Sequence, residues 1–268
     1  MKAIFNSRLT NIESIKLDIA NRAFCYGDGL FETIVTGASR INLIDFHLDR
    51  LKKACELMQM KPPVFTSTEL LKMIQQLAKE NGLQGTIRAK LQIWRDTGGL
   101  YTPTEKASSF LLQVAETNRP FFRQMGELGV SNTSSIHFTP VSFAKTISAL
   151  PYVLAGIECR QRGLDDIILL NNEGHVSETH TSNIFWVKGD QVFTPLISTG
   201  CIAGIMRRYI LEQIGVKQVT VIQEELQLAD SIFSTNASGV AYFSHFGGKP
   251  LKSPEHLLYS IFKQPQQP

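Results

Sequence analysis

The spacing of apolar residues predicts short strands at the start of the chain and two amphipathic helices after them. Residues 3–34 form short apolar runs separated by turn-forming residues, which is typical of short strands. A helix over residues 45–58 is expected, with Asp45 as its N-cap, because apolar side chains recur there at helical spacing: Leu48, Leu51, Ala54, Cys55 and Met58. A second helix is expected from Thr68 to Lys79, ending at Asn81-Gly82.

Strands and helices continue to alternate through the rest of the chain. Strands are expected over residues 86–94, 110–116, 167–170, 183–187 and 191–194, and helices over residues 149–162 and 204–215. The first two of these strands flank a glycine-rich loop at residues 96–101. The fold class is α/β or α+β with mixed sheets, because periodicity alone does not choose between the two.

A polar stretch before a proline marks the expected domain boundary. Thr117-Asn118-Arg119-Pro120 separates two segments of similar size, as a linker would. The predicted division is an N-terminal domain over residues 1–116, a linker over residues 117–122 and a second domain over residues 123–268.

The composition is that of an ordinary globular protein and argues against several classes. The 268 residues are 43% hydrophobic and 19% charged, and the net charge of +3 is too balanced to favour nucleic acid or a membrane surface. No stretch reaches the roughly 18–20 apolar residues of a membrane helix, and no signal segment is evident at the N-terminus. The 4 cysteines are scattered without a CxxC pair, which argues against a zinc site and a disulfide scaffold. A reduced, cytoplasmic protein without a metal is therefore expected.

Single motifs say little about function in this chain. The sequence contains no G-x-x-x-x-G-K-[ST] phosphate loop, no dinucleotide fingerprint and no H-E-x-x-H. Taken alone, Lys145 would be a surface lysine and Glu178 a solvated strand residue. Only the combination of several segments changes this interpretation.

Four separated segments stand out when taken in order: residues 21–33, residues 47–51, residues 144–155, and the stretch from Glu178 through 183–185 and 194–195 to 204–207. Together they resemble the class IV aminotransferases, also called fold-type IV pyridoxal 5′-phosphate (PLP) enzymes. The family includes branched-chain aminotransferases, D-amino-acid aminotransferases and aminodeoxychorismate lyases. The order and spacing match over nearly the whole chain, and four ordered matches by chance are improbable.

The resemblance assigns the two central roles. Lys145 matches the lysine that forms the Schiff base with PLP; its amine must be neutral to react, which requires burial or nearby positive charge. Once freed by the substrate, this amine is the natural base for the Cα proton. Glu178 matches the carboxylate that keeps the pyridine nitrogen protonated, so that the ring accepts the electrons left on Cα.

The resemblance also implies a phosphate site. Arg50 resembles the family's phosphate-binding arginine, and His47, three residues earlier on the same helix face, is expected to pack or orient rather than to catalyse. Gly204-Ile205-Met206 begins a helix whose free N–H groups favour an anion. Asn236 falls where the family has a second phosphate-contacting loop, although a plain turn would explain it equally well.

Three positions depart from the family pattern near the expected cofactor. His180 stands two residues after Glu178, where the family usually has a small residue. Ser148 and Tyr152 each replace an asparagine. These departures concern the detailed chemistry of the pocket rather than the identity of the cofactor.

The choice of reaction depends on the substrate loops, because transaminases and lyases use the same lysine. Residues 26–33 are similar to the signature of the aminodeoxychorismate lyase branch, and residues 95–103 resemble its R-x-x-G-G-x-Y loop. The compact length agrees with that branch. In it, Lys145 would remove the Cα proton, and aromatisation would drive release of 4-aminobenzoate and pyruvate.

The substrate side and the alternatives follow from the same resemblance. Arg95, Tyr101 and Arg88 are candidates to orient the substrate carboxylates, and loop anchoring is an equally good role for Arg95. The alternative is a branched-chain or D-amino-acid aminotransferase, since Thr86-Ile87-Arg88 resembles a Y-x-R element without its tyrosine. A non-catalytic PLP-binding protein is disfavoured by the intact lysine and glutamate, and a nucleotide-binding module by the missing phosphate loop.

The family fold implies two α/β domains with mixed sheets, the second pseudo-barrel-like, and a cofactor between them. It also implies a small amino-acid-like substrate and a homodimer whose active site takes a loop from the partner.

Overall fold

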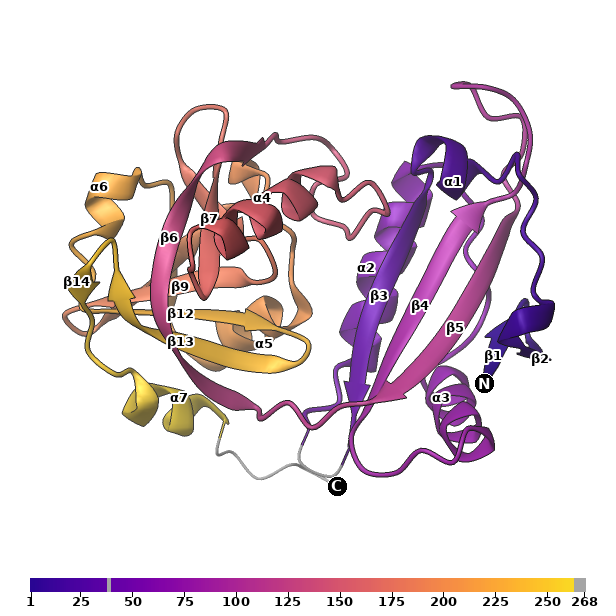
Figure 1. The fold of residues 1–268 in the computed structure, drawn as a ribbon, viewed down its shortest axis with the longest axis horizontal. Coiled ribbons are helices and arrows are strands. Elements are labelled where there is room, and N and C mark those ends of the chain that lie inside the picture. The colour runs from indigo at the N-terminus through magenta and orange to yellow at the C-terminus, as the bar shows by residue number, and fades with distance from the viewer. Residues whose placement is uncertain (38–39, 263–268) are drawn as a thin grey trace. The chain divides into compact units, whose positions relative to one another are not determined.

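The computed structural model describes residues 1–37 and 40–262 of the chain, which form two compact units (Figure 1). The first unit comprises Met1–Arg119 and Ala144–Ser148, and the second comprises Pro120–Phe143 and the chain from Ala149 onward. The chain thus leaves the first unit within the predicted linker. The segment Ala144–Ser148 differs from the predicted division, because it pairs with a strand of the first unit and belongs there.

The first unit is an antiparallel sheet with helices on one face (Figure 1). Its strands are β1 (Lys2–Phe5), β2 (Arg8–Asn11), β3 (Gly29–Thr36), β4 (Ile87–Arg95) and β5 (Ser108–Glu116), in the order β2-β1-β5-β4-β3. Its helices are the 3-10 turn η1 (Ile12–Ser14), α1 (Arg22–Tyr26), α2 (Ile44–Leu57) and α3 (Ser67–Glu80). The short α1 lies in a region for which only strands and turns were predicted.

Alternation along the strands places one face of this sheet against α2 and α3. In β4, Ala89, Leu91 and Ile93 are buried on the helix side, between residues that are more exposed. Helix α3 begins with a capping box between Thr66 and Glu69, in which each satisfies a backbone N–H of the other. The strand and helix spacing of the sequence therefore predicted this unit well.

The predicted N-cap of α2 is wrong. Helix α2 starts one residue earlier, at Ile44, so Asp45 lies in its first turn and accepts a hydrogen bond from Ser67. Asn42 Oδ1 accepts from the Ile44 N–H instead, at 3.2 Å. An acidic residue is also favourable inside the first turn, because of the helix dipole. Asp45 therefore marks the start of the helix without being its N-cap.

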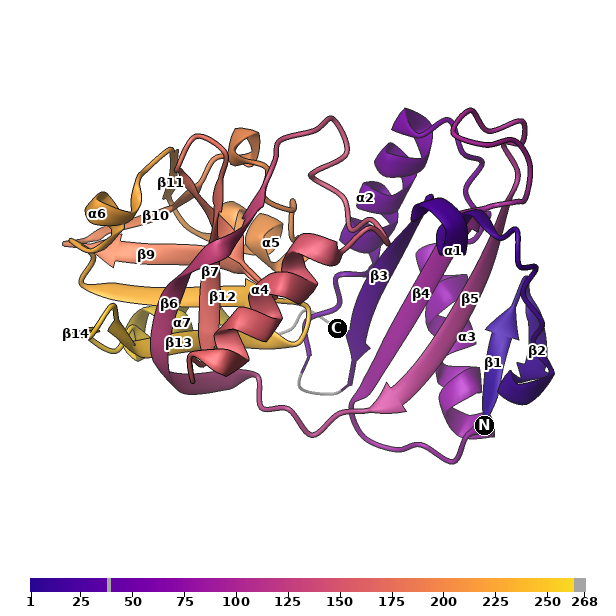
Figure 2. The ribbon, with the colours of Figure 1, turned by 45° about the horizontal axis from the view of Figure 1, so that its top comes forward.

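The second unit is a mixed sheet that curls into a half-barrel (Figure 2). Its strands are β6 (Phe122–Ile136), β7 (Asp166–Asn171), β8 (Val176–Thr179), β9 (Asn183–Lys188), β10 (Gln191–Pro195), β11 (Val216–Val219), β12 (Ser231–Asn236), β13 (Gly239–Phe246) and β14 (Lys249–Pro250). They follow the order β11-β10-β9-β12-β13-β6-β7-β8, with β14 paired to β13. The predicted class, an α/β fold with two units and a barrel-like second one, is confirmed; the sheet of the second unit is mixed, whereas that of the first is antiparallel.

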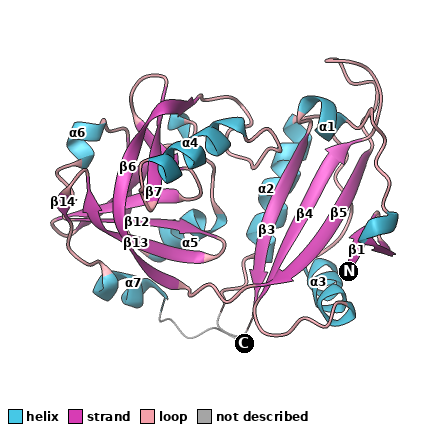
Figure 3. Cartoon of the chain, in the orientation of Figure 1, coloured by secondary structure: helices cyan, strands magenta, loops and turns pink. Residues whose placement is uncertain are grey.

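Helices border this sheet, and its central strands are buried. The helices are α4 (Leu150–Gln161), η2 (Ile197–Thr199), α5 (Ile205–Gln213), α6 (Gln223–Leu226) and α7 (Glu255–Phe262); Figure 3 shows α4 beside β6 and β7. Phe185 of β9 and Phe233 of β12 are fully buried, with stacked rings 5.1 Å apart. Over the described ranges, no helix is long and apolar enough to cross a membrane.

Candidate active site

The segment that carries Lys145 lies along β3. The Phe31 N–H donates to the Lys145 carbonyl at 2.8 Å, and the Ile147 N–H donates to the Gly29 carbonyl at 3.0 Å. A Cβ at Gly29 would lie 2.6 Å from Ile147 Cδ1 and also 2.6 Å from the Ile93 carbonyl oxygen of β4, so this position requires glycine. The first and third family-like segments of the sequence thus meet in the structure.

The Lys145 side chain lies on the face of the sheet opposite α2. Glu32 points toward α2, so its neighbours Phe31 and Thr33 point to the other face. The Lys145 Nζ lies 4.8 Å from the centre of the Phe31 ring. Arg88 of β4 is exposed, and alternation places it on this same face.

Glu178 is held by two donors inside the second unit. Its carboxylate is 2% exposed, and it accepts a hydrogen bond from Tyr152 Oη at 2.7 Å and from Asn183 Nδ2 at 3.1 Å. Burial and the neighbouring Glu178 charge raise the pKa of Tyr152 above its usual value, so Tyr152 is the donor. Tyr152, which departs from the family pattern, is therefore hydrogen-bonded directly to Glu178.

His180 directly follows β8 and is hydrogen-bonded within the second unit. Its Nδ1 lies 2.6 Å from Asp166 Oδ1, and Thr179 Oγ1 donates to the other oxygen of Asp166 at 3.0 Å. His180, which departs from the family pattern, is therefore paired with Asp166 of the second unit.

The start of α5 offers donors for an anion. Gly204 is the N-cap residue, and no side chain of the described residues caps this helix, so its first N–H groups are available. Ile205 and Met206 are buried, at 6% and 3% exposure. Helix α5 packs against β12, where Ser234 Oγ and Thr235 Oγ1 are buried without a hydrogen-bond partner in the described structure.

Asn236 at the end of β12 has a different environment from these hydroxyls. Its Nδ2 donates to Ser182 Oγ at 2.9 Å, and its Oδ1 accepts from the Ser238 N–H at 2.8 Å. These contacts link the β12–β13 turn to Ser182 and agree with the turn role, one of the two roles that the sequence left open. Ser234 and Thr235 were not singled out from sequence, because a buried, unsatisfied hydroxyl is visible only in a folded structure.

Arg50 forms a buried ion pair in the first unit. Its Nε donates to Glu32 Oε1 at 2.8 Å, and its Nη2 contacts the other oxygen, which His47 Nδ1 also approaches at 2.6 Å. Although burial alone would raise it, the charges of Arg50 and His47 lower the pKa of Glu32 to about 2. His47 therefore orients Glu32, in keeping with its expected orienting role.

Arg95 is buried inside the first unit. Its guanidinium is buried and donates to Asp28 at 2.8 Å, to the Met58 carbonyl at 2.7 Å and to the Gln59 and Glu105 carbonyls at 3.2 Å. These contacts fit the anchoring role, one of the two roles that the sequence left open for Arg95.

Arg22 is a residue that the sequence did not single out. Its Nε donates to Asp28 Oδ2 at 2.8 Å, and its Nη1 donates to three loop carbonyls: Gly98 at 3.0 Å, Gly99 at 3.1 Å and Leu100 at 2.6 Å. Burial would raise the pKa of Asp28, but Arg95 and Arg22 together lower it. Beyond this anchor, Tyr101 is 90% exposed and its ring contacts Tyr26, with the ring centres 5.6 Å apart.

A family model of class IV aminotransferases matches residues 29–243. The chain belongs to the class IV aminotransferase family. This family is PLP-dependent, so the chain is a PLP-dependent aminotransferase or lyase.

This class IV aminotransferase has relatives of both activities. It is 29% identical over 244 residues to an aminodeoxychorismate lyase of Bacillus subtilis, a match that covers 87% of this chain and 82% of the relative. It is 26% identical over 249 residues to a putative branched-chain-amino-acid aminotransferase of Methanocaldococcus jannaschii, covering 89% and 85%. The specific reaction is left open by these likenesses.

The fold of this class IV aminotransferase is that of solved branched-chain aminotransferases. The Escherichia coli enzyme matches with a TM-score of 0.86 and 22% identity over 98% of this chain and 93% of that chain. A second branched-chain aminotransferase, solved with pyridoxamine 5′-phosphate, matches with a TM-score of 0.84 and 21% identity, over 98% and 92%.

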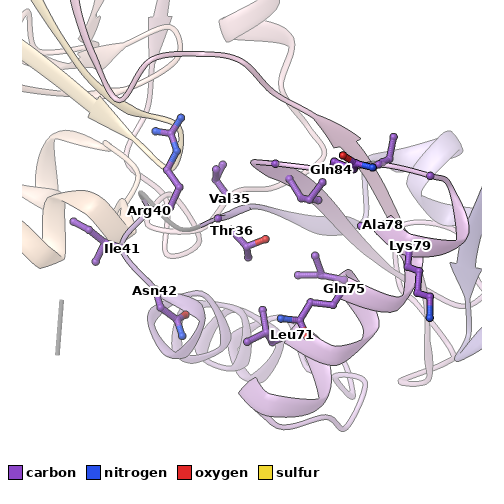
Figure 4. Close-up of a pocket in the computed structure, with 16 residues that line it drawn as sticks. Val35, Thr36, Arg40, Ile41, Asn42, Leu71, Gln75, Ala78, Lys79 and Gln84 are labelled. Atoms are coloured by element: carbon purple, nitrogen blue, oxygen red, sulfur yellow. The ribbon is translucent and has the colours of Figure 1, made fainter. Parts of the chain in front are cut away.

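A cavity of about 710 Å³ in the first unit lies apart from the predicted residues (Figure 4). Leu71, Ile74 and Ala78 of α3 line it together with Thr36 and Ile87 at the strand ends. The cavity is thus bordered by α3 and by the ends of β3 and β4. None of the residues predicted to bind cofactor or substrate is among its described lining residues.

Proposed function

We propose that this enzyme is a 4-amino-4-deoxychorismate lyase that releases 4-aminobenzoate and pyruvate. The observation that carries the choice is the coupling of its two lyase-like segments. Asp28 of the first segment binds Arg95 of the second at 2.8 Å, and Arg22 holds the glycine loop between Arg95 and Tyr101. The same first segment also contains Gly29, whose carbonyl accepts a hydrogen bond from Ile147 in the segment that carries Lys145.

The residues present fit PLP as the cofactor. The uncapped start of α5 and the unsatisfied hydroxyls of Ser234 and Thr235 suit the oxygens of a phosphate group. Gly204, Ile205 and Met206 would hold that phosphate, with Arg50 as a cationic partner and Asn236 bracing the adjoining turn. PLP, when bound, supplies an electron sink for the charge left when a Cα proton is removed.

Two residues of the chain would carry the chemistry. Lys145 would hold the cofactor through its amine and, in its neutral form, take the proton from the substrate carbon that bears the amino group. Glu178 would face the pyridine nitrogen, and Tyr152 and Asn183 fix the direction of its carboxylate.

The substrate carboxylates need cationic partners on the face of the first sheet where Lys145 lies. Arg88 is the best of the three candidates from sequence, because it is exposed on the face of the sheet where Lys145 lies. Tyr101 is exposed at the loop tip, where it would serve a second copy of the chain. Arg95 is left to anchor the loop.

A homodimer is part of this proposal. Helix α4 exposes an apolar stripe at helical spacing, formed by Leu150, Val153, Leu154 and Ile157, with 44–65% of each residue exposed. Monomeric proteins rarely leave such a stripe in water, and a second copy of the chain is the proposed cover.

A branched-chain aminotransferase is the second candidate. It is favoured by the Methanocaldococcus jannaschii relative and by Arg88 in the strand element Thr86-Ile87-Arg88. An aminotransferase must return a proton to the cofactor, whereas the lyase needs only the removal step and a leaving group.

The deciding experiment is the visible spectrum of the PLP-loaded protein with candidate substrates. We expect a band from lysine-bound PLP that Lys145→Ala abolishes, little response to L-glutamate or to branched-chain and D-amino acids, and 4-aminobenzoate release from 4-amino-4-deoxychorismate. Full conversion to the pyridoxamine form by an amino donor, without 4-aminobenzoate release, would instead establish the aminotransferase. Absence of the band after loading would refute PLP binding.

Two variants test the individual assignments. Glu178→Ala is expected to retain PLP but to lose turnover, and near-normal turnover would remove its assigned role. Arg50→Ala is expected to lose PLP on dialysis, and unchanged retention would contradict the phosphate assignment.

A further inference from the structure

A second lysine shares an aromatic ring with Lys145. The Lys145 Nζ lies 4.8 Å from the centre of the Phe31 ring, and the Lys90 Nζ lies 5.5 Å from the same centre. An aromatic face attracts one ammonium group, but two ammonium groups beside one ring repel each other. The two Nζ atoms therefore lie at most about 10 Å apart, close enough for their charges to interact.

The backbone positions Lys90 for this contact. Strand β4 pairs with β3 so that Lys90 stands opposite Thr33, two residues from Phe31. Its neighbours Ala89 and Leu91 are buried on the helix side, at 0% and 1% exposure, which directs Lys90 to the opposite face. The strand register, rather than a chance side-chain rotamer, places the second ammonium.

Among the described positions of β3, β4 and β5, none beside the ring on this face carries a carboxylate. On the same face, β3 presents Thr33 and β5 presents Leu111 and Gln113, none of which titrates. Along β4 the flanking residues are Arg88, a further cation, and Gln92. Beyond the end of β4, Asp96 accepts a hydrogen bond from Ser109 at 2.7 Å, and Glu32 is turned to the helix side by Arg50.

We propose that Lys90 is a positioning residue that keeps the Lys145 amine in its neutral, reactive form. A positive charge at Lys90 disfavours a second one at Lys145, so the Lys145 amine loses its proton at a lower pH. Neutral amine is what both the attachment of a carbonyl and the removal of a proton require. This inference rests on the proposed function of Lys145, but the protonation of Lys145 is measurable without cofactor.

The test is trace acetylation of the PLP-free protein across a pH series, with the reaction at Lys145 quantified by peptide mass spectrometry. In Lys90→Met we expect the labelling midpoint of Lys145 to rise and its rate near neutral pH to fall by roughly 10-fold. Lys90→Arg keeps the charge and should label as the wild type does. Lys52→Met, at an exposed position of α2, is the matched control and should also leave Lys145 unchanged.

An unchanged Lys145 midpoint in both Lys90→Met and Lys90→Gln would overturn the inference, and the circular-dichroism spectrum of each variant shows that it folds as the wild type does. A fall in Lys90→Arg equal to that in Lys90→Met would also overturn it, because packing rather than charge would then be responsible. Failure of the proposed function is distinguishable, since it appears as absence of PLP attachment to Lys145 in the wild type.

Discussion

Tyr152 Oη donates to Glu178 Oε1 at 2.7 Å, which joins α4 to the carboxylate proposed to face the cofactor nitrogen. Removing this donor leaves a buried carboxylate oxygen with one partner fewer. Tyr152→Phe is therefore expected to fold and retain PLP but to turn over about 10-fold more slowly, the equivalent of roughly 1.5 kcal/mol. Steady-state kinetics checks this, with Tyr209→Phe on α5 as the matched control. Equal rates for the two variants would show that Tyr152 does not act through Glu178.

The Glu32 ion pair predicts a specific loss of stability in acid. Its pKa is about 2 in the folded chain, below the ordinary value of 4.5, so the stabilisation is complete above pH 4.5 and is lost as the pH falls toward 2. The whole contribution is about 3 kcal/mol. Urea unfolding at several pH values measures it, and in a Trp186→Phe background Trp94 alone reports on the first unit.

The matched variant for this prediction is Glu32→Gln. It leaves Arg50 buried without its carboxylate, so we expect a loss of about 3–5 kcal/mol near neutral pH. The free energy of unfolding of Glu32→Gln should also depend less on pH between pH 4.5 and pH 2 than that of the wild type. If Glu32→Gln lost as much stability in acid as the wild type does, a group other than Glu32 would be responsible for the acid sensitivity.

Arg22 is predicted to hold the loop that ends at Tyr101. Arg22→Met removes donors to three carbonyls and one contact to Asp28, so residues 98–101 should exchange their amide hydrogens faster, with roughly 1–2 kcal/mol of protection lost. Hydrogen-exchange mass spectrometry checks this. Arg8→Met, at an exposed residue of β2, should leave the loop as it was. Unchanged exchange in Arg22→Met would mean that Arg95 anchors the loop without help.

The apolar stripe of α4 predicts the oligomeric state. Leu154→Lys places a charge in the middle of the stripe, and we expect the dimer dissociation constant to rise by about 100-fold. Sedimentation at several concentrations measures this. Gln161→Lys adds the same charge at an exposed position at the end of α4 and should leave the dimer intact. A wild-type chain that sediments as a monomer at all concentrations would refute the dimer.

The sequence by itself determined the elements and the family. Periodicity predicts the helices α2, α3 and α4 and the strands β4, β5, β7, β9 and β10 to within a few residues, because apolar spacing is a local property of the chain. The four ordered segments indicated the family, because residues that serve one cofactor recur at preserved positions. The misplaced cap, Asp45, lay one position from the start of α2, where both Ncap and first-turn sites favour an acid.

Only the tertiary structure decided which side chains meet. The pairing of Lys145 with β3, the shared ring of Phe31 and the partners of Glu178 join residues that are distant in sequence. The structure also gives the buried Arg95 its carbonyl partners, because these come from two segments, Met58-Gln59 and Glu105, that only folding brings together. Contacts of this kind arise from strand register and burial, which a one-dimensional pattern does not encode.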